Sequence, residues 1–173
     1  MLSLDRPSPR GLSRLVRPTD HLRHSIVRSV NEANEAVEAS RIARSYLESF
    51  ATGSSEAIAA HVSADFVNEH TSALGAGCVG RDAYRKALVG FLGDMVDLRY
   101  EVEHLIVEGS EVAAFYTLTA RWQGEHSISV RGVQRLVVAD GLITHRTDYW
   151  DSAVFLTQTS EEARSALTPF GIV

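Results

Sequence analysis

The sequence predicts an α+β domain in which helices come first and a curled antiparallel sheet follows. Apolar residues recur at helical spacing in the first half of the chain, and from about residue 98 the spacing changes to alternation. The alternating segments are joined by short links, which indicate antiparallel neighbours because a parallel crossover needs about a dozen residues or more. The length of 173 residues fits one domain of ordinary size.

Three helices are expected before the sheet. The first spans residues 29–53, where Ser29 and Glu32 match a capping box. A second, shorter helix is expected to begin after Ser54, whose side chain can cap it. The third spans residues 80–97, with an apolar stripe of Tyr84, Leu88, Phe91, Leu92 and Met95.

Four strands are expected after the helices, over residues 98–107, 111–122, 126–138 and 142–150. They are longer than the usual strand of about five or six residues. Long antiparallel strands curl, and Gly132 inside the third strand is expected to mark a bulge or a bend. A curled sheet can hold helices on its concave side, which completes the predicted layer arrangement.

A further extended segment, DFVNEH over residues 65–70, is expected between the second and third helices. The loop after it, residues 71–80, contains three glycines that leave its backbone free to turn. The loop is too short and too irregular for a phosphate-binding fingerprint, which needs its glycines between a strand and a helix at set spacing. We therefore expect no nucleotide site here.

The last strand carries the most informative side chains. Side chains two apart in a strand point the same way, so Arg146, Asp148 and Trp150 share one face. Charged groups are rarely buried unless they are paired or used. Two interpretations remain open from these residues alone: a solvated face with a surface ion pair, or one wall of a pocket. The opposite face carries His145, Thr147 and Tyr149.

Composition excludes several classes of function. The net charge of -5 gives no reason to expect a nucleic-acid partner. The single cysteine, Cys78, excludes an intrachain disulfide, and we expect a reducing, cytoplasmic location. No apolar run reaches the roughly 18 residues of a membrane span. His104 and His126 fall on different strands without a third ligand, so we expect no metal site.

The first thirty residues differ from the rest, because six arginines against two aspartates give them a formal +4 and leave -9 for the remainder. We predict a basic arm over residues 1–28, a domain over residues 29–160 and a C-terminal tail over residues 161–173. The arm is expected to be flexible or peripheral. An organelle-type presequence, an early start codon, or an arm packed through its apolar residues are the alternatives.

Two local sequences resemble a known superfamily. They are DFVNEH followed by GRDAYRKAL, and the ending DGLITHRTDYWDSAVFLTQ, in which an Asp-Tyr-aromatic-Asp exit leads into a Leu and Gln tail. Together with the element order, they resemble the NTF2-like cone fold over residues 36–158, in its SnoaL-like branch of polyketide cyclases. That branch lies close to ketosteroid isomerase and limonene epoxide hydrolase.

The resemblance implies roles for single residues. Asp148 matches the last-strand aspartate that limonene epoxide hydrolase uses as an acid/base group, and Asn68 and His70 fall where that enzyme holds its water. The hydrolase also has an Arg-x-Asp on the strand that corresponds to residues 111–122, whereas no acid occurs at residues 115–118 here. The base, tyrosine and protonated acid of ketosteroid isomerase cannot be placed either.

SnoaL-type chemistry fits better, because one acid/base group can suffice for a substrate with acidic hydrogens. We predict a small enzyme without cofactor, a cyclase, isomerase or lyase that acts on an apolar carbonyl compound. Asp148 is the expected acid/base, Arg146 its charge partner, and His70 a second proton carrier with a pKa near the ordinary 6.5. The substrate-binding residues are expected to be Asn68, Phe66, Tyr84, Phe91, Tyr116 and Trp150.

Two alternatives from other classes remain open: an epoxide hydrolase with an altered active site, and a non-catalytic binding module. They remain open because the same fold hosts both enzymes and binding proteins. The resemblance also implies a homodimer through the convex face of the sheet, which carries His145, Thr147 and Tyr149.

Overall fold

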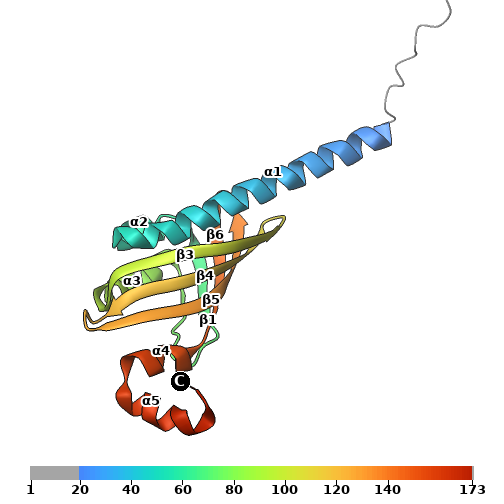
Figure 1. Ribbon diagram of the computed structural model, residues 1–173. Helices are drawn as coiled ribbons and strands as arrows, with labels where there is room; N and C mark the ends of the chain where they lie inside the picture. The colour runs from blue at the N-terminus through green and yellow to red at the C-terminus, as the bar shows by residue number, and fades with distance from the viewer. Residues whose placement is uncertain (1–19, 173) are drawn as a thin grey trace, which may run out of the picture.

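A curved six-stranded sheet forms the body of the protein, with the order β2-β1-β6-β5-β4-β3. The computed structural model describes residues 20–172 (Figure 1). The predicted α+β class and the four-stranded antiparallel meander are confirmed. The meander consists of β3 (Met95–Glu108), β4 (Glu111–Trp122), β5 (His126–Ala139) and β6 (Leu142–Trp150).

Two strands extend the sheet beyond the predicted meander. The DFVNEH segment belongs to β1 (Val62–His70), which pairs with β6 in parallel, and β2 (Cys78–Val79) covers the outer edge of β1. The parallel pairing joins segments that are far apart in the sequence. It places Asn68 next to Arg146, and His70 next to Asp148.

The first helix is longer than predicted. Helix α1 (Asp20–Ser49) passes through Ser29 without interruption and continues into the short 3-10 turn η1 (Phe50–Thr52), so the predicted start at Ser29 is wrong. A capping box is a local signal, and it has no effect where the residues before it continue the helix. Residues 1–19 of the predicted arm lie outside the described part of the chain.

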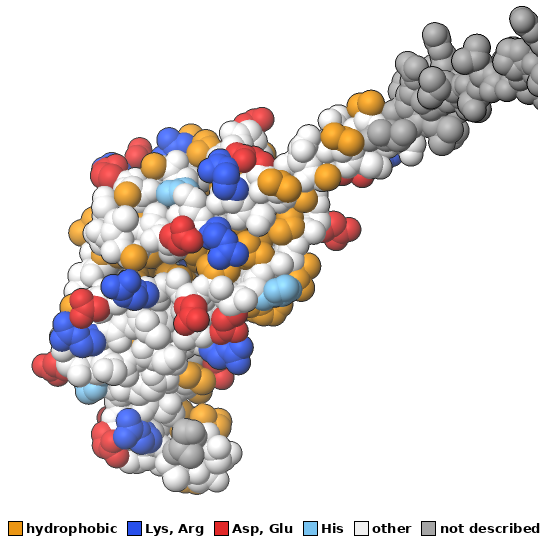
Figure 2. Space-filling view, turned by 45° about the horizontal axis from the view of Figure 1, so that its top comes forward, with side chains coloured by type: hydrophobic (Ala, Val, Ile, Leu, Met, Phe, Trp, Pro, Cys, Tyr) orange, Lys and Arg blue, Asp and Glu red, His pale blue; other side chains and the backbone are white. Residues whose placement is uncertain are grey.

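Only the second half of α1 packs on the body. Its first half projects away from the sheet (Figure 1) and carries the exposed side chains of Val27 and Val30. Figure 2 shows apolar side chains along this projection, while charged side chains of both signs are scattered over the visible face of the body.

The second and third helices lie close to their predicted positions. Helix α2 (Ser55–Ala59) is capped by Ser54, whose Oγ accepts a hydrogen bond from the Ala57 amide at 3.2 Å, as expected. Helix α3 (Arg81–Asp94) ends before Met95, which the apolar stripe had placed in the helix. Met95 instead opens β3 opposite Trp122, because pairing with β4 outweighs the helical pattern.

Bulges occur in the sheet, but not at Gly132. The register shifts between Val96 and Arg99 and again between Val102 and His104 in β3, where an extra residue bends a strand. Gly132 pairs in unbroken register with both neighbouring strands. A Cβ atom there would lie 2.4 Å from the Tyr116 hydroxyl, so the glycine is needed for the close approach of that ring.

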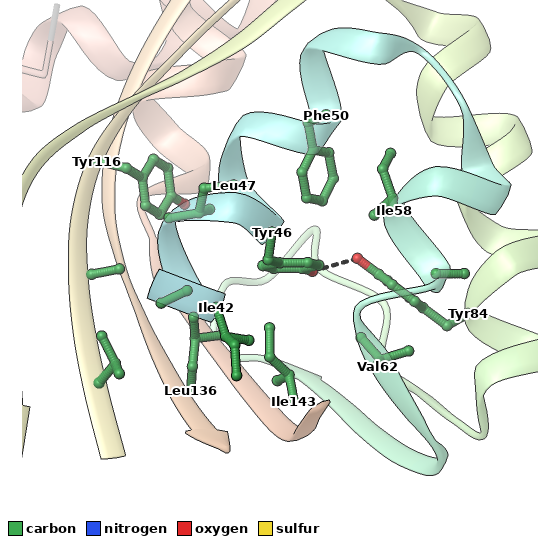
Figure 3. Close-up of a cluster of buried hydrophobic side chains, with 14 of the residues drawn as sticks. Ile42, Tyr46, Leu47, Phe50, Ile58, Val62, Tyr84, Tyr116, Leu136 and Ile143 are labelled. Atoms are coloured by element: carbon green, nitrogen blue, oxygen red, sulfur yellow. Dashed lines mark hydrogen bonds between the residues drawn. The ribbon is translucent and has the colours of Figure 1, made fainter. Parts of the chain in front are cut away.

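The core lies between the sheet and helices α1, α2 and α3. Tyr46 and Leu47 of α1 are fully buried, and in Figure 3 Tyr46 lies between Tyr116 on the sheet and Tyr84 on α3. Phe50 contacts the ring of Tyr46 edge-on at 5.3 Å between ring centroids. This layer of aromatic rings forms the floor of the site described below.

Three short elements follow the last strand: α4 (Ser152–Thr159), α5 (Glu161–Leu167) and η2 (Thr168–Phe170), so residues 161–173 of the predicted tail are partly helical. Asp151 caps α4, since its carboxylate accepts from the Ala153 amide at 2.8 Å. Gln158 binds the backbone N–H and C=O of Ser129, at 2.6 and 3.0 Å, and so fixes α4 on the sheet. Within residues 20–172, no helix is long and apolar enough to cross a membrane.

Candidate active site

A cavity of about 460 Å³ lies between the concave face of the sheet, the turn η1 and helices α3 and α4. Such a volume suits a small organic molecule. Its wall is mainly aromatic and aliphatic, and its polar groups gather where β1 and β6 meet. The wall includes Asn68, His70, Tyr84, Asp94, Tyr100, Tyr116, Trp122, Arg146, Asp148, Trp150 and Phe155.

Asp148 and Arg146 form a buried ion pair at this polar end. Arg146 is 4% exposed and Asp148 is 2% exposed, and Nη2 of the arginine contacts Oδ2 of the carboxylate. Two further donors hold the carboxylate: the Tyr116 hydroxyl binds Oδ1 at 2.8 Å and Gln134 Nε2 binds Oδ2 at 3.3 Å. The interpretation of Arg146 and Asp148 as a solvated surface pair is therefore wrong, because both side chains face the interior.

The other end of the guanidinium contacts two tyrosines. Arg146 Nη1 lies 3.2 Å from the Tyr46 hydroxyl and 3.4 Å from the Tyr84 hydroxyl, and the two hydroxyls are 2.5 Å apart. Burial opposes the charge of Arg146, but Tyr46 and Asp148 outweigh it, and the pKa of Arg146 is raised. Burial also raises the pKa of Tyr46 and Tyr84, so both keep their protons near neutral pH. The arginine remains a buried cation.

His70 lies beside the ion pair in a neutral form. Its Nδ1 atom is 3.9 Å from Oδ2 of Asp148 and 3.3 Å from the Trp150 indole nitrogen. The indole N–H can only donate, so Nδ1 accepts and the imidazole carries its proton on Nε2. This N–H lies 3.4 Å from Nδ2 of Asn68, which is itself a donor and does not accept the proton.

The protonation of His70 differs from the sequence prediction. Burial is the main cause, Arg146 adds to it, and together they lower the pKa of His70 to about 4 against the opposing effect of Asp148. The expectation of a pKa near the ordinary value is therefore wrong, because the sequence did not show that this side chain is buried beside a cation. At neutral pH, His70 can donate one hydrogen bond but carries no charge.

The backbone of the loop after β1 packs closely against His70 and Asn68. A Cβ atom on Gly75 would lie 2.2 Å from the Cβ of His70, and one on Gly77 would lie 2.7 Å from the Asn68 carbonyl oxygen. The glycines were expected to allow turning. In the structure, two of them also leave room for the strand that carries the site.

Most of the predicted site residues meet in this cavity, with one exception. Phe66 is fully buried and packs edge-on against Tyr84, with ring centroids 4.9 Å apart, and it does not line the cavity, so its assignment to substrate binding is wrong. Phe66 lies on the inward side of β1, where α3 packs over it and separates it from the cavity. The predicted residues that line the cavity are Asn68, His70, Tyr84, Phe91, Tyr116, Arg146, Asp148 and Trp150.

Sequence reasoning missed Tyr46, Tyr100 and Gln134. Tyr46 and Tyr100 follow apolar patterns and cannot be told from core residues by spacing. Gln134 gave a usable signal, because it is a polar residue among the inward positions of β5. A buried polar residue inside such a stripe needs a partner, and Asp148 is that partner.

The polar cluster costs stability. Asn68 Oδ1, Gln134 Oε1 and Arg146 Nε are buried without a hydrogen-bond partner among the described residues. Each such atom costs about 1–3 kcal/mol, and a buried ion pair is often no better for stability than apolar side chains of the same size. A cluster of this composition that faces a cavity indicates a functional site.

Other features of the sheet bear on ligands and partners. Within residues 20–172, no group of three or more His, Cys, Asp or Glu side chains is arranged to hold a metal ion.

On the convex face, His145 binds Glu69 at 2.7 Å and Tyr149 is 47% exposed. Thr147 is already covered and donates to Glu69 at 3.1 Å.

Comparison with solved structures shows the same fold in several proteins. A protein with a ketosteroid isomerase-like fold from Catenulispora acidiphila DSM 44928 has a TM-score of 0.65 at 17% identity, over 71% of this chain and 95% of that one. A candidate SnoaL-like polyketide cyclase from Jannaschia sp. CCS1 has a TM-score of 0.65 at 14% identity, over 73% and 94% of the two chains.

An LEH-like epoxide hydrolase from M. tuberculosis has a TM-score of 0.64 at 19% identity, over 78% of this chain and 98% of the hydrolase. At these identities, the likeness shows the fold alone. No curated protein sequence matches the chain significantly. The sequence does match the SnoaL-like domain family over residues 43–146, which contain β1, α3 and Arg146. The chain belongs to the SnoaL-like domain family.

Proposed function

We propose that this protein is a cofactor-independent enzyme that moves a proton on an apolar carbonyl compound, as a cyclase, isomerase or lyase would. One observation carries the proposal, namely the buried Asp148–Arg146 pair at the inner end of a mainly apolar cavity. A carboxylate in such a position can remove a proton next to a carbonyl, and the nearby cation favours the negative charge that develops.

The proposed step can be assigned to atoms. Asp148 takes a proton from the carbon next to the carbonyl, and the electron pair of that C–H bond moves to the carbonyl oxygen as an enolate. The Nε2–H of neutral His70 is the nearby donor for this oxygen, and Arg146 contributes its charge without direct contact. Return of the proton to another carbon completes an isomerisation. Attack of the enolate carbon on a second carbonyl, whose oxygen then takes the proton back from Asp148, completes a cyclisation.

Exchange of carbon-bound hydrogen tests this proposal without knowledge of the natural substrate. Apolar ketones such as 2-tetralone are incubated with the protein in heavy water at pH 7, and loss of the α-hydrogen signal is followed by proton NMR. We expect exchange above the buffer rate for some members of such a panel, because removal of the proton is the first step. A panel that binds but never exchanges would favour the binding module.

The epoxide hydrolase alternative has weaker support. The strand that holds the second acid of that enzyme places Tyr116 toward Asp148, and this hydroxyl donates to the carboxylate instead of accepting from a water. Burial raises the pKa of Tyr116, so it does not act as a base at neutral pH. Formation of a diol from limonene oxide in the same assay would reverse the order of the two candidates.

We further propose that the convex face of the sheet pairs two copies of the chain. Tyr149 is exposed there, and the face also carries ion pairs such as Arg135–Glu111 and His145–Glu69. Light scattering at micromolar concentration is expected to give the mass of a dimer, and Tyr149→Arg should weaken it because a cation must then be buried in the contact. A monomer for the unaltered protein at that concentration would reject this proposal.

A further inference from the structure

The cavity has a second charged point, far from Asp148. Asp94 is the last residue of α3, is partly buried and lines the cavity. Its carbonyl oxygen accepts from the Gln123 amide at 2.7 Å, which places Asp94 beside the end of β4. Tyr116, whose hydroxyl binds Asp148, lies six positions before Trp122, the last residue of β4. At about 3.3 Å per residue, this places the two ends of that segment about 20 Å apart. Asp94 and Asp148 therefore lie at opposite ends of the cavity.

Asp94 carries a charge that the described residues do not neutralise. Among residues 27–172, no basic side chain forms an ion pair with Asp94. Arg121 on the adjacent strand end binds Asp97 at 2.9 and 3.0 Å and the Gly124 carbonyl at 3.3 Å. At the far end, Arg146 balances Asp148.

The charges of the cavity wall therefore leave a net negative charge at the Asp94 end. His70 does not change this balance at neutral pH, because its pKa is about 4. A cationic group is favoured there over a neutral or an anionic one.

Aromatic rings surround the same end. Phe91 precedes Asp94 by one helical turn on α3, and Trp122 stands opposite Met95 in the sheet. Phe155 of α4 contacts Trp122 edge-on, with 5.2 Å between ring centroids, and all three rings line the cavity. The faces of aromatic rings attract cations through their quadrupoles, most strongly for tryptophan. A carboxylate among such rings suits an ammonium group better than a neutral hydroxyl.

We propose that the Asp94 end of the cavity is a binding subsite for the protonated amine of a ligand whose apolar body extends toward Asp148. This inference deepens the proposed function, since it assigns a chemical class to the substrate of the same cavity. It does not depend on catalysis, because an amine that cannot react at Asp148 still binds Asp94.

Three matched ligands test the subsite in the intact protein. Binding of 6-phenylhexylamine, 6-phenylhexan-1-ol and 6-phenylhexanoate is measured by calorimetry at pH 7 and low salt. They share one apolar body and differ in the charge of the head group. We expect the amine to bind at least about threefold more tightly than the alcohol, as for a partly exposed ion pair, and the carboxylate to bind most weakly.

Two variants locate the effect. Asp94→Asn should make the affinities of amine and alcohol equal. Asp82→Asn is the matched control, because it removes the same charge from the other end of α3, where the side chain is 86% exposed, and it should keep the preference. Equal affinities in the unaltered protein, no binding of the amine, or a preference that persists in Asp94→Asn would each overturn the proposal.

Asp148→Asn separates this inference from the proposed function. An amine preference that survives this substitution while α-hydrogen exchange is lost supports both proposals. An amine preference with no exchange in the unaltered protein keeps the subsite and rejects the enzyme. Exchange without an amine preference keeps the enzyme and rejects the subsite. A preference lost in Asp148→Asn but kept in Asp94→Asn would place the amine at the wrong end and overturn the inference.

Discussion

Asp148→Asn is expected to lower turnover by about a hundred- to ten-thousand-fold, the usual contribution of a general acid/base group. Asparagine keeps the shape of the side chain but cannot take the proton. The same change should lower the free energy of unfolding by about 3–5 kcal/mol, because it leaves Arg146 as a buried cation without its counterion. Turnover and thermal unfolding are measured on the same preparation, below the melting temperature of the variant.

Ile143→Ala controls for the loss of stability. Ile143 lies on the same strand, is fully buried and is not part of the cavity wall. Its truncation should cost about 2–5 kcal/mol while turnover per folded molecule stays near that of the unaltered protein. If Asp148→Asn kept its activity within about threefold, the carboxylate would be structural and the binding module would become the leading interpretation.

The stability of the protein is expected to fall as the pH is lowered from 6.5 toward 4, because of His70. The folded-state pKa of His70 is about 4 against the ordinary 6.5, so in this window the unfolded chain binds a proton that the folded chain does not. The loss begins below pH 6.5 and is complete near pH 4. Between pH 6.5 and 5 it amounts to about 2 kcal/mol from this one group. Urea unfolding at several pH values measures it.

His70→Asn should flatten the stability profile in this window, since asparagine can still accept from the Trp150 indole but does not titrate. His126→Asn is the matched control, because His126 is exposed at the start of β5, and its profile should follow that of the unaltered protein. Measurements stay above pH 5, where carboxylates with lowered pKa values such as Glu69 and Glu103 contribute little. An unchanged slope in His70→Asn would show that the imidazole is not buried as the structure has it.

Most of the fold followed from local patterns. The alternation from residue 98 onward predicted the strands of the meander to within a few residues, because short links leave antiparallel pairing as the one option for neighbours. Ser54 was recognised as a cap because a cap bonds within its own helix turn. The start of α1 and the end of α3 were misplaced, since Ser29 and Met95 carry local signals that their surroundings override.

The site was predicted only in part, because local patterns do not contain the surroundings of a side chain. Alternation in β6 put Arg146 and Asp148 on one face, and this was enough to name them together. It could not distinguish a buried pair from a solvated one, because burial depends on what covers the face. The covering comes from α1, α3 and β1, which lie about sixty to a hundred positions earlier in the sequence.

The sequence by itself determined the fold class, the four strands of the meander and the shared face of Arg146 and Asp148, because each rests on spacing within one segment. Only the tertiary structure decided that β1 runs parallel to β6 and places His70 beside Asp148. It also decided that Tyr46, Tyr84, Tyr116 and Gln134 enclose the pair. These contacts join distant segments, and their energies and the shifted pKa of His70 depend on distance and desolvation, which sequence spacing does not contain.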